Sequence, residues 1–546
     1  MAKFDTVPHE ILERIAFISA TDTLLGPPST LVTLLVANRR IHARLSFASN
    51  PYFYARVYHA KFDVCGSFRR SEAQSSPAVL AYELVHRFRL LNRIRAKTDA
   101  AARPGSAGDG DSVHELLFHA YLMMLENAGK NELQLRGYAR MGDWLRGYLF
   151  EDHLASSTRS RVTPHVEHWP PHNDHTSLAM WLFWFLLRPD DYAVDDDATW
   201  NILNVLKIYA LGAHKYPLTD PSWVDFLPES PQHSTHTVRF PEAHQLKTPP
   251  LATPAILSFL TLVNLKAKLI DFSSHLDLPV QPESNEWEYE LGRCLSLSRP
   301  EFGQVLTDSF RPGSVEGTWE GIFTYTEFTA YAALLQGAPP PILQKSVIVR
   351  HRQTWKLREH HFVKHGATYR PPTPGDNLCD GGNSDGGIDN SHPLSAGDPL
   401  RAYLPTESRI LETSDGLKVH DPHHLTDVQY HRAATGLNER DGDTNESETR
   451  VQDIIITGEG HSAWGQFNLV GRVRPCDGFI SLCKEYIDHD RGKWIYRGYL
   501  VGNVNSNLAG RWRDTLSPAA VPGYEGCFLM TRRRDWNAPP PIAVKQ

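Results

Sequence analysis

The chain has 546 residues, of which 41% are hydrophobic, 22% charged and 10% aromatic. Its length predicts two or three folding units of about 100–200 residues each, and its 13 Trp and 23 Phe exclude a chain that is disordered throughout. The 56 Lys and Arg against 63 Asp and Glu give a formal net charge of −7, which argues against a protein that mainly neutralises nucleic acid phosphates. Six cysteines without a Cys-x-x-Cys pair argue against a disulfide framework and favour a reducing compartment.

The sequence shows neither a signal peptide nor a membrane-spanning stretch. An acid and a proline, Asp5 and Pro8, come early, and the apolar core of a signal peptide is missing. The strongest apolar run, 178–187, has about half of the ~20 residues that a membrane-spanning helix needs. We therefore expect a cytoplasmic and/or nuclear protein whose partners are neither a membrane nor a nucleic acid.

Residues 4–62 predict a small helical block. Asp5 supplies a capping oxygen, Pro8 fits the first turn of a helix, and Glu10 complements the helix dipole. Gly-Pro-Pro-Ser at 26–29 then interrupts the chain before a second apolar helix. Apolar side chains recur at helical spacing in both halves, namely Ile11, Leu12, Ile15, Leu31, Leu34, Leu35, Val36, Ile41 and Leu45.

The middle of the chain is predicted to be mainly helical. Residues 99–111 are small, Gly-rich and acidic, as is typical of a surface linker. From about 77 to 300 the apolar period is helical, and the absence of a repeat of 20–50 residues argues against a solenoid. We expect an irregular helical scaffold, with its clearest helices at 113–125, 178–187, 200–211 and 254–272.

After Pro312-Gly313 the apolar period changes to two and glycines punctuate the segments. Short strands with regular turn signals are typical of an antiparallel barrel or sandwich. Residues 366–450 read as an insertion, of which the first half is expected to be mobile, whereas 401–430 can return to add strands. The predicted strands are 317–326, 346–350, 354–363, 453–457, 466–472, 479–486, 493–501 and 526–532.

A recognisable pattern lies in the N-terminal block. Val7-Pro8-x-Glu10-Ile11-Leu12-x-x-Ile15 is followed, after the break, by Leu-Leu-Val-Ala-Asn-Arg-Arg-Ile-His at 34–42. This pattern resembles an F-box. The resemblance implies that residues 4–50 bind a Skp-family adaptor, which connects to a cullin and a RING subunit. The side chains that it places against the adaptor are Val7, Pro8, Ile11, Leu12, Ile15, Leu34 and Val36.

The physical argument for such docking is the small size of the block. A unit this short cannot bury all of its apolar side chains and gains stability by binding another protein. Each Val, Leu or Ile that becomes fully buried could contribute ~1.5–3 kcal/mol. The alternative is an ordinary helical hairpin that packs on the middle of the same chain.

The C-terminal region also carries a resemblance. Gly-Thr-Trp-Glu-Gly at 317–321 opens it, and Gly-Arg-Trp at 510–512 nearly closes it. This Gly-x-Trp opening and the Gly-flanked strands are similar to calycin-type barrels such as lipocalins and avidins, and to the β-rich tails of fungal F-box proteins. The resemblance implies a surface that binds a peptide or small molecule. The alternative is that the aromatic residues Trp319, Phe467, Trp494 and Trp512 form only the barrel core.

Together these patterns predict the fold class α+β with several domains. We expect F-box helices at 1–62, an irregular helical scaffold or linker domain at 63–312, and a lipocalin/avidin-like antiparallel β-barrel at 313–534. The mobile insertion at 366–450 interrupts the barrel, and a disordered tail follows at 535–546.

Neither a metal nor a cofactor is predicted. Histidines cluster at 165–175, 360–365 and 420–424, but the spacing of a metalloprotease or a zinc finger is missing. We interpret these clusters as solvated loop histidines rather than metal ligands.

Catalytic residues are likewise not predicted. Ser462 lacks the second glycine of a nucleophile elbow, and the glycines at 458–460 precede strand-like residues rather than a phosphate-binding helix. Cys476, Cys483 and Cys527 occupy strand-like positions, which argues against a ubiquitin-carrying cysteine.

The leading hypothesis is a non-catalytic substrate receptor of an SCF-type (Skp–cullin–F-box) ubiquitin ligase, with a protein substrate that the sequence does not identify. Such a receptor raises the effective concentration of a substrate lysine near the charged conjugating enzyme. The main alternative is a barrel that binds a small molecule or peptide, with structural N-terminal helices. A hydrolase that uses Ser462 or the histidine clusters is the third hypothesis.

Overall fold

The structure is a computed structural model of the chain. The tail predicted at 535–546, most of the linker at 99–111 and the first half of the insertion lie outside the residues that it describes. The described residues are 7–63, 76–97, 99, 110–151, 169–193, 196–219, 223–227, 234–240, 242–267, 288–296, 306, 309–345, 348–364, 393–432, 450–488, 491–502 and 507–533.

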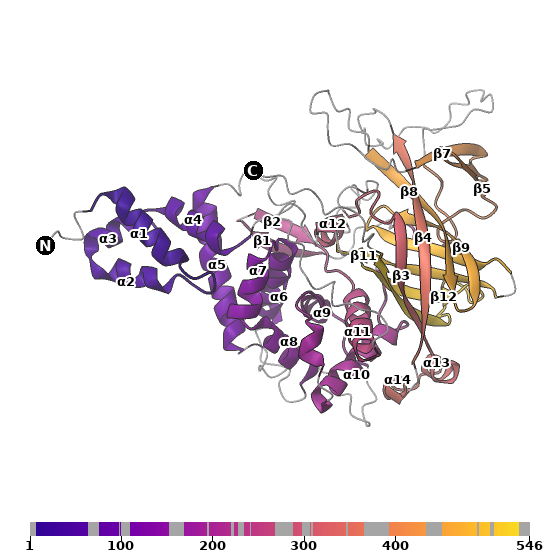
Figure 1. Cartoon of the computed structure of the whole chain (residues 1–546), viewed down its shortest axis with the longest axis horizontal. Helices are drawn as coiled ribbons and strands as arrows, with labels where there is room; N and C mark the ends of the chain where they lie inside the picture. The colour runs from indigo at the N-terminus through magenta and orange to yellow at the C-terminus, as the bar shows by residue number, and fades with distance from the viewer. Residues whose placement is uncertain are drawn as a thin grey trace.

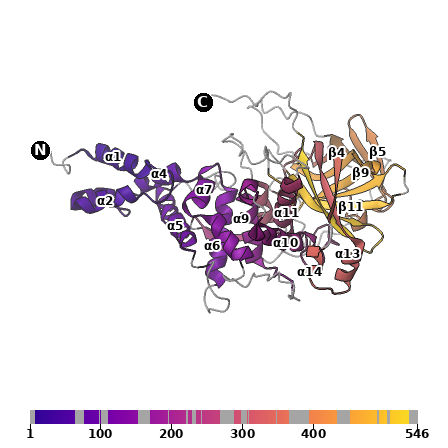
Figure 2. The same cartoon turned by 60° about the horizontal axis from the view of Figure 1, so that its bottom comes forward.

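The molecule is elongated, with the N-terminal helices at one end and a β-barrel at the other (Figure 1). The remaining helices lie between these two ends. The same separation is visible in the turned view of Figure 2. Among the described helices, none combines the length and the apolar character that a bilayer crossing requires.

The N-terminal end consists of short helices whose starts follow the capping rules. The Asn50 side chain accepts a hydrogen bond from the Phe53 N–H at 3.0 Å, and Asn38 accepts one from the Arg40 N–H at 2.7 Å. Pro51 occupies the first turn of the last helix, where a missing N–H costs nothing. These helices are α1 (His9–Thr21), α2 (Ser29–Ala37), α3 (Arg39–Leu45) and α4 (Pro51–Lys61).

Buried polar contacts join this end to the middle helices. Asp63 Oδ2 accepts a hydrogen bond from the Lys130 N–H at 2.7 Å, and the Asp63 carbonyl accepts one from the buried Arg87 at 3.3 Å. Both contacts satisfy polar groups that would otherwise be costly to bury. The middle helices are α5 (Pro77–Ala96), α6 (Gly110–Leu125), α7 (Lys130–Leu133), α8 (Met141–Phe150), α9 (Asp174–Phe185), α10 (Asp197–Leu211), α11 (Ala252–Ala267) and α12 (Glu288–Ser296).

The helical middle agrees with the sequence prediction, with one addition. The helices predicted at 113–125, 178–187 and 200–211 are confirmed as α6, α9 and α10, and α11 confirms the described part of the helix predicted at 254–272. A β-hairpin was not anticipated, because strands this short show too little alternation to stand out. It pairs β1 (Thr235–Arg239) with β2 (Glu242–Leu246).

In the C-terminal part, eight antiparallel strands close into a barrel within the described residues. Pairing of the first strand with both the second and the last removes the free edges that an open sheet would expose. The order around the barrel is β3 (Gly317–Thr326), β13 (Glu525–Arg532), β12 (Asn507–Asp514), β11 (Lys493–Val501), β10 (Phe479–Tyr486), β9 (Gly465–Arg474), β8 (Arg450–Ser462) and β4 (Ile348–Lys364).

The predicted antiparallel barrel is confirmed, and its strands differ in two places. The strands predicted at 346–350 and 354–363 are one continuous strand, β4, and β12 was not predicted. The second half of the insertion does add strands, which continue the sheet beyond β4. They are β5 (Arg409–Thr413), β6 (Gly416–Asp421) and β7 (Thr426–Arg432), and the short helices α13 (Phe328–Leu335) and α14 (Pro341–Lys345) connect β3 to β4.

Large aromatic side chains fill the barrel interior, and glycines let its strands approach closely. Trp319 and Trp355 lie opposite each other on β3 and β4, and both are fully buried. Gly498 on β11 pairs with Gly510 on β12. A Cβ atom at Gly510 would lie 1.9 Å from the Arg497 carbonyl oxygen, so a side chain there would force these strands apart.

The outer face of the barrel is joined to the helices by buried arginines. Arg511 of β12 donates to the carbonyls of Ala210, in the last turn of α10, at 3.1 Å and of Tyr216 beyond it. A carbonyl in the last turn of a helix, such as that of Ala210, has no hydrogen-bond partner within the helix, and the C-terminal end of a helix favours a cation. Arg497 of β11 similarly donates to the Trp223 carbonyl at 2.8 Å, and Arg474 of β9 donates to that of Asp225 at 3.1 Å.

Replacing Arg511 with Met should destabilise the protein. The substitution keeps an apolar stem but removes the guanidinium donors of the Tyr209 and Ala210 carbonyls in a buried interface, where Ala210 keeps the Cys527 thiol as a donor. We expect the free energy of unfolding to fall by roughly 2–4 kcal/mol. Urea denaturation followed by circular dichroism measures the change.

The matched control is Arg409→Met, because Arg409 is an exposed arginine of β5. Its free energy of unfolding should stay within about 0.5 kcal/mol of wild type. Equal urea midpoints for Arg511→Met and wild type would contradict the structural role assigned to Arg511.

Candidate functional site

The first candidate site is the solvent-facing side of the N-terminal helices. On α1, Ile11 and Ile18 are 52% and 58% exposed, and Ile15 between them is partly buried. These three positions follow the i, i+4, i+7 spacing of one helix face. Leu12 and Ala16 lie on the opposite side and are buried in the core of the chain.

α2 contributes a second exposed apolar side. Val32 and Val36 are one turn apart and are 58% and 77% exposed, whereas Leu31 is buried. α2 packs against α1, so both sets of side chains belong to one pair of helices. Four large aliphatic side chains exposed on two packed helices point to a binding partner more than isolated exposed residues would. We call them the N-terminal apolar set: Ile11, Ile18, Val32 and Val36.

The seven residues predicted to face an adaptor occupy different environments. Pro8, Ile11 and Val36 are exposed, and Val7, Ile15 and Leu34 are partly buried. Leu12 is 1% exposed and packs inside the chain, so it offers no surface to a partner. Pro8 directly precedes α1 instead of lying in its first turn. Ile18 and Val32 were not predicted, although both continue the same helical spacing.

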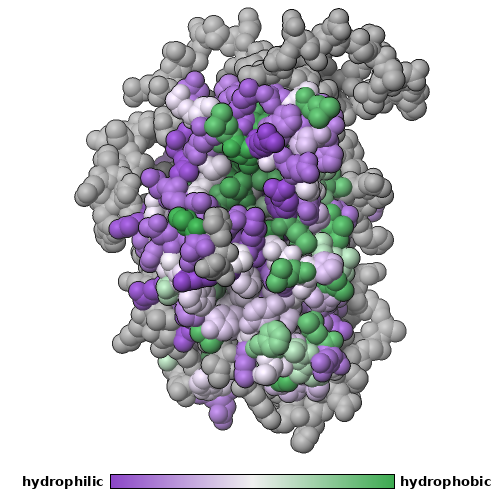
Figure 3. All heavy atoms as spheres, turned by 90° about the vertical axis from the view of Figure 1, so that its right-hand side faces the viewer, coloured by the Kyte–Doolittle hydropathy of each residue, from purple (hydrophilic) through white to green (hydrophobic). Residues whose placement is uncertain are grey.

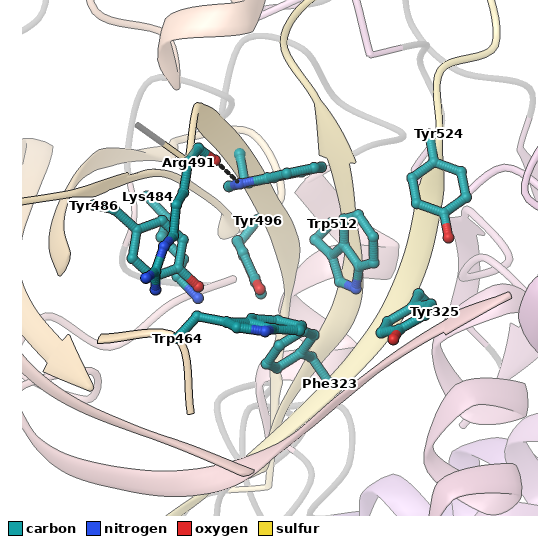
Figure 4. Close-up of a pocket in the computed structure, with 10 residues that line it drawn as sticks. Phe323, Tyr325, Trp464, Lys484, Tyr486, Arg491, Tyr496, Trp512 and Tyr524 are labelled. Carbon is teal, nitrogen blue, oxygen red and sulfur yellow. Dashed lines mark hydrogen bonds between the residues drawn. The ribbon is translucent and has the colours of Figure 1, made fainter. Parts of the chain in front are cut away.

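The second candidate site is a cavity of about 310 Å³ at one end of the barrel. Antiparallel strands alternate in direction, so the ends of β10 and β12 meet the starts of β11 and β13 at the same rim. This volume is at the lower end of the roughly 300–1,000 Å³ typical of ligand pockets. Its lining, drawn in Figure 4, is Phe323, Tyr325, Trp464, Lys484, Tyr486, Arg491, Trp494, Tyr496, Trp512 and Tyr524.

Lys484 is the unusual member of this lining, because its register on β10 points a charged side chain into the barrel. Its Nζ lies 3.9 Å from the centre of the Phe467 ring and 4.8 Å from that of Tyr486. Among the described residues, the ammonium donates only to Gln353 Oε1, at 3.4 Å. Burial lowers the pKa of Lys484 to about 7. The surrounding ring faces attract the ammonium and so offset part of the cost of burying its charge.

Arg491 provides a second cation beside Lys484. It forms an ion pair with Asp488 at 3.4 Å, and its carbonyl accepts a hydrogen bond from Trp494 Nε1 at 3.0 Å, drawn as the dashed line in Figure 4. Lys484, Tyr486 and Arg491 gather on one side of the cavity, and Trp512, Tyr325 and Tyr524 on the other. The described residues that line the cavity thus include two cations and no carboxylate.

Aromatic side chains form the rest of the lining. Trp464, in the turn between β8 and β9, is 37% exposed and lies 5.2 Å from the Phe323 ring and 4.4 Å from the His351 ring. Figure 3 shows the face of the molecule at the barrel end, which is largely hydrophilic with several hydrophobic patches.

The four aromatic residues singled out in the sequence divide into two groups. Trp319 and Phe467 are fully buried in the barrel core, whereas Trp494 and Trp512 line the cavity. Lys484 was missed, although the sequence contained a signal for it. It occupies an inward position between Leu482 and Tyr486, where the period of two calls for an apolar side chain.

The residues of the hydrolase hypothesis do not form a triad in the described part of the chain. The Ser462 hydroxyl lies 3.2 Å from the Tyr486 hydroxyl and 3.3 Å from the Trp464 N–H, which donates to it. A histidine and a carboxylate are missing from these contacts among the described residues.

The structure places the histidines differently from the sequence interpretation. His360 and His361 lie in β4 and His360 is fully buried, so the prediction of a solvated loop was wrong for this pair. Burial lowers the pKa of His360 to about 4, and its Nε2 lies 3.0 Å from Thr457 Oγ1.

One group of described residues could hold a metal ion. His86 of α5 and Glu115 and His119 of α6 bring one ligand atom each to within 4.8 Å of one another. Two imidazoles and a carboxylate are ligands that Zn²⁺ accepts. None of the predicted histidine clusters contains these residues.

Comparisons with protein-family models, with curated proteins and with solved structures found no match.

The buried amine makes a prediction about stability and pH. Because the pKa of Lys484 is lowered, the unfolded chain binds a proton that the folded protein lacks between pH ~7 and the ordinary lysine pKa of ~10.4. The free energy of unfolding of the wild type therefore rises with pH in this window. Relative to Lys484→Met, the wild type should therefore gain about 2 kcal/mol in free energy of unfolding between pH 7 and pH 9. Urea denaturation at both pH values measures it.

Lys356→Met serves as the control, because Lys356 is an exposed lysine on β4. The stability difference between this variant and wild type should not change over the same pH range. The burial of a titrating amine in the barrel would be contradicted if the difference in free energy of unfolding between Lys484→Met and wild type also stayed the same at both pH values.

Proposed function

We propose that the chain is the substrate receptor of an SCF-type ubiquitin ligase, with its N-terminal helices bound to a Skp-family adaptor and its barrel holding the protein to be modified. The observation that carries this proposal is the N-terminal apolar set, whose members are 52–77% exposed. The F-box-like pattern of the sequence begins at the same helices. Burying the exposed part of these side chains against an adaptor would favour a complex, because apolar surface would be removed from water.

The placement of the two sites supports this division of labour. The N-terminal helices and the barrel lie at opposite ends of the molecule, with the middle helices between them (Figures 1 and 2). A partner bound at one end therefore leaves the other end accessible. The receptor would act by proximity, holding a substrate lysine near the charged conjugating enzyme.

The cysteines that the structure describes support a receptor without thiol chemistry of its own. Burial raises the pKa of the Cys527 thiol to about 12 and that of Cys483 to about 11. Because the thiolate is the nucleophile, thiols held this strongly in the protonated form are poor carriers of ubiquitin.

A second candidate function is a ligand-binding barrel whose N-terminal helices are structural. The cavity at the barrel end favours it, because most of its lining is aromatic and Lys484 points inward. The exposure of several aliphatic side chains on α1 and α2 favours the receptor, because exposed apolar groups that gather on one part of a surface are typical of interaction sites. The two functions are compatible in one chain.

Substitution of two members of the apolar set should strongly weaken adaptor binding without unfolding the chain. We expect Ile11→Glu combined with Val36→Glu to weaken the complex with a Skp-family adaptor by about a hundredfold or more, because two charges would replace buried aliphatic groups. The measurement is co-purification of the adaptor with the full chain. The thermal midpoint should be unchanged, since both side chains are exposed in the free protein.

The matched control is Leu411→Glu combined with Leu516→Glu, which alters two aliphatic side chains that are 62% and 94% exposed in the barrel part of the chain. This variant should recover as much adaptor as wild type. The receptor proposal fails if wild type recovers no adaptor, or if both double variants recover the same amount.

A further inference from the structure

The barrel cavity has two unlike sides. One side presents the ammonium of Lys484 and the guanidinium of Arg491, and the other presents the rings of Trp512 and Tyr325 (Figure 4). Such a division fits a ligand that is itself charged at one end and flat and apolar at the other. The cavity volume of about 310 Å³ restricts that ligand to a small molecule.

The charge of the ligand can be inferred from the hydrogen-bond acceptors that the Lys484 ammonium lacks. An ammonium group has three donors, and among the described residues this one meets a single acceptor, Gln353 Oε1, at the long distance of 3.4 Å. A buried charge is costly unless it is paired. A carboxylate in the cavity would supply the missing acceptors, whereas a cationic ligand would be repelled by Lys484; Arg491 is already paired with Asp488.

The aromatic side of the cavity determines the body of the ligand. Trp464 reaches over Phe323 from the β8–β9 turn, with 5.2 Å between the ring centres, and Trp512 lies across the cavity. Offset and edge-to-face contacts with several rings favour a flat aromatic body over a branched aliphatic one.

We propose that the barrel cavity binds a small aromatic acid, with its acidic group at Lys484 and Arg491 and its ring system among Trp464, Phe323 and Trp512. This inference deepens the second candidate function, the ligand-binding barrel, and rests on it, but it does not require adaptor binding. Ligand binding and adaptor recovery can therefore fail separately.

Proton uptake should accompany binding, because an anion stabilises the charged form of Lys484. Burial raises the pKa values of Tyr486, Tyr496 and Tyr524 and lowers that of His351, so these groups stay neutral above pH 7. Arg491 and Tyr325 are the other titratable side chains of the described lining.

The test uses the purified full chain and isothermal titration calorimetry with three probes of one shape: 2-naphthoate, its neutral amide and 2-naphthylmethylamine. Wild type should bind the acid at one site, at least tenfold more tightly than the amide and the amine. Its affinity for the acid should fall tenfold or more from pH 7 to pH 9, while its affinity for the amide stays constant.

Two variants make the outcome decisive. Lys484→Met should reduce the affinity for the acid to that for the amide, remove the pH dependence and leave the amide unaffected. Lys356→Met, on the exposed side of β4, should behave as wild type. The proposal is overturned if the acid shows no saturable binding, if acid and amide bind equally, or if folded Lys484→Met retains the wild-type affinity for the acid.

Discussion

The structure depends on the buried arginines that join the outside of the barrel to the helices. Arg511 occupies the carbonyl end of α10, and Arg497 and Arg474 hold the backbone that follows. Each guanidinium places several N–H donors in a fixed geometry. These donors suit the carbonyl groups at and after the end of a helix, which have no partner within the helix. Because of these contacts, the apolar core of the helices continues onto the outer face of the barrel, up to Leu529 of β13. The barrel is thus supported from outside as well as from within.

The barrel interior keeps a cavity at one end. Aliphatic and aromatic side chains together fill most of the interior, but at one end aromatic rings surround an open volume with Lys484 on its wall. A lysine in that position costs stability, because its charged form is buried without a full set of acceptors. A group that costs stability and faces a cavity is a candidate for function, and we assign it the recognition of an acidic group.

The sequence predicted the fold where side chains followed a regular period and missed it where functional or interfacial polar residues broke that period. β4 was divided in two because Gln353, an inward polar residue that contacts Lys484, interrupts its apolar alternation. β12 was missed because Arg511 and Arg513 occupy its outward positions, which are buried in the structure. The convergence of β3, β10, β11 and β12 on one cavity depends on strand order around the barrel, which the sequence pattern does not contain. On α1, the residues predicted from the helical period include both the exposed Ile11 and the buried Leu12, because spacing alone does not say which side faces the core.

The central claim is that this molecule has two independent ends, one that meets a protein through exposed aliphatic side chains and one that recognises its target through the barrel. Hydrogen–deuterium exchange of the full chain, free and with a Skp-family adaptor, tests it most directly. The account predicts slower exchange in α1 and α2 on adaptor binding and unchanged exchange in the barrel strands from β8 to β13. Protection confined to the barrel, or exchange in α1 and α2 that the adaptor leaves unaltered, would contradict it.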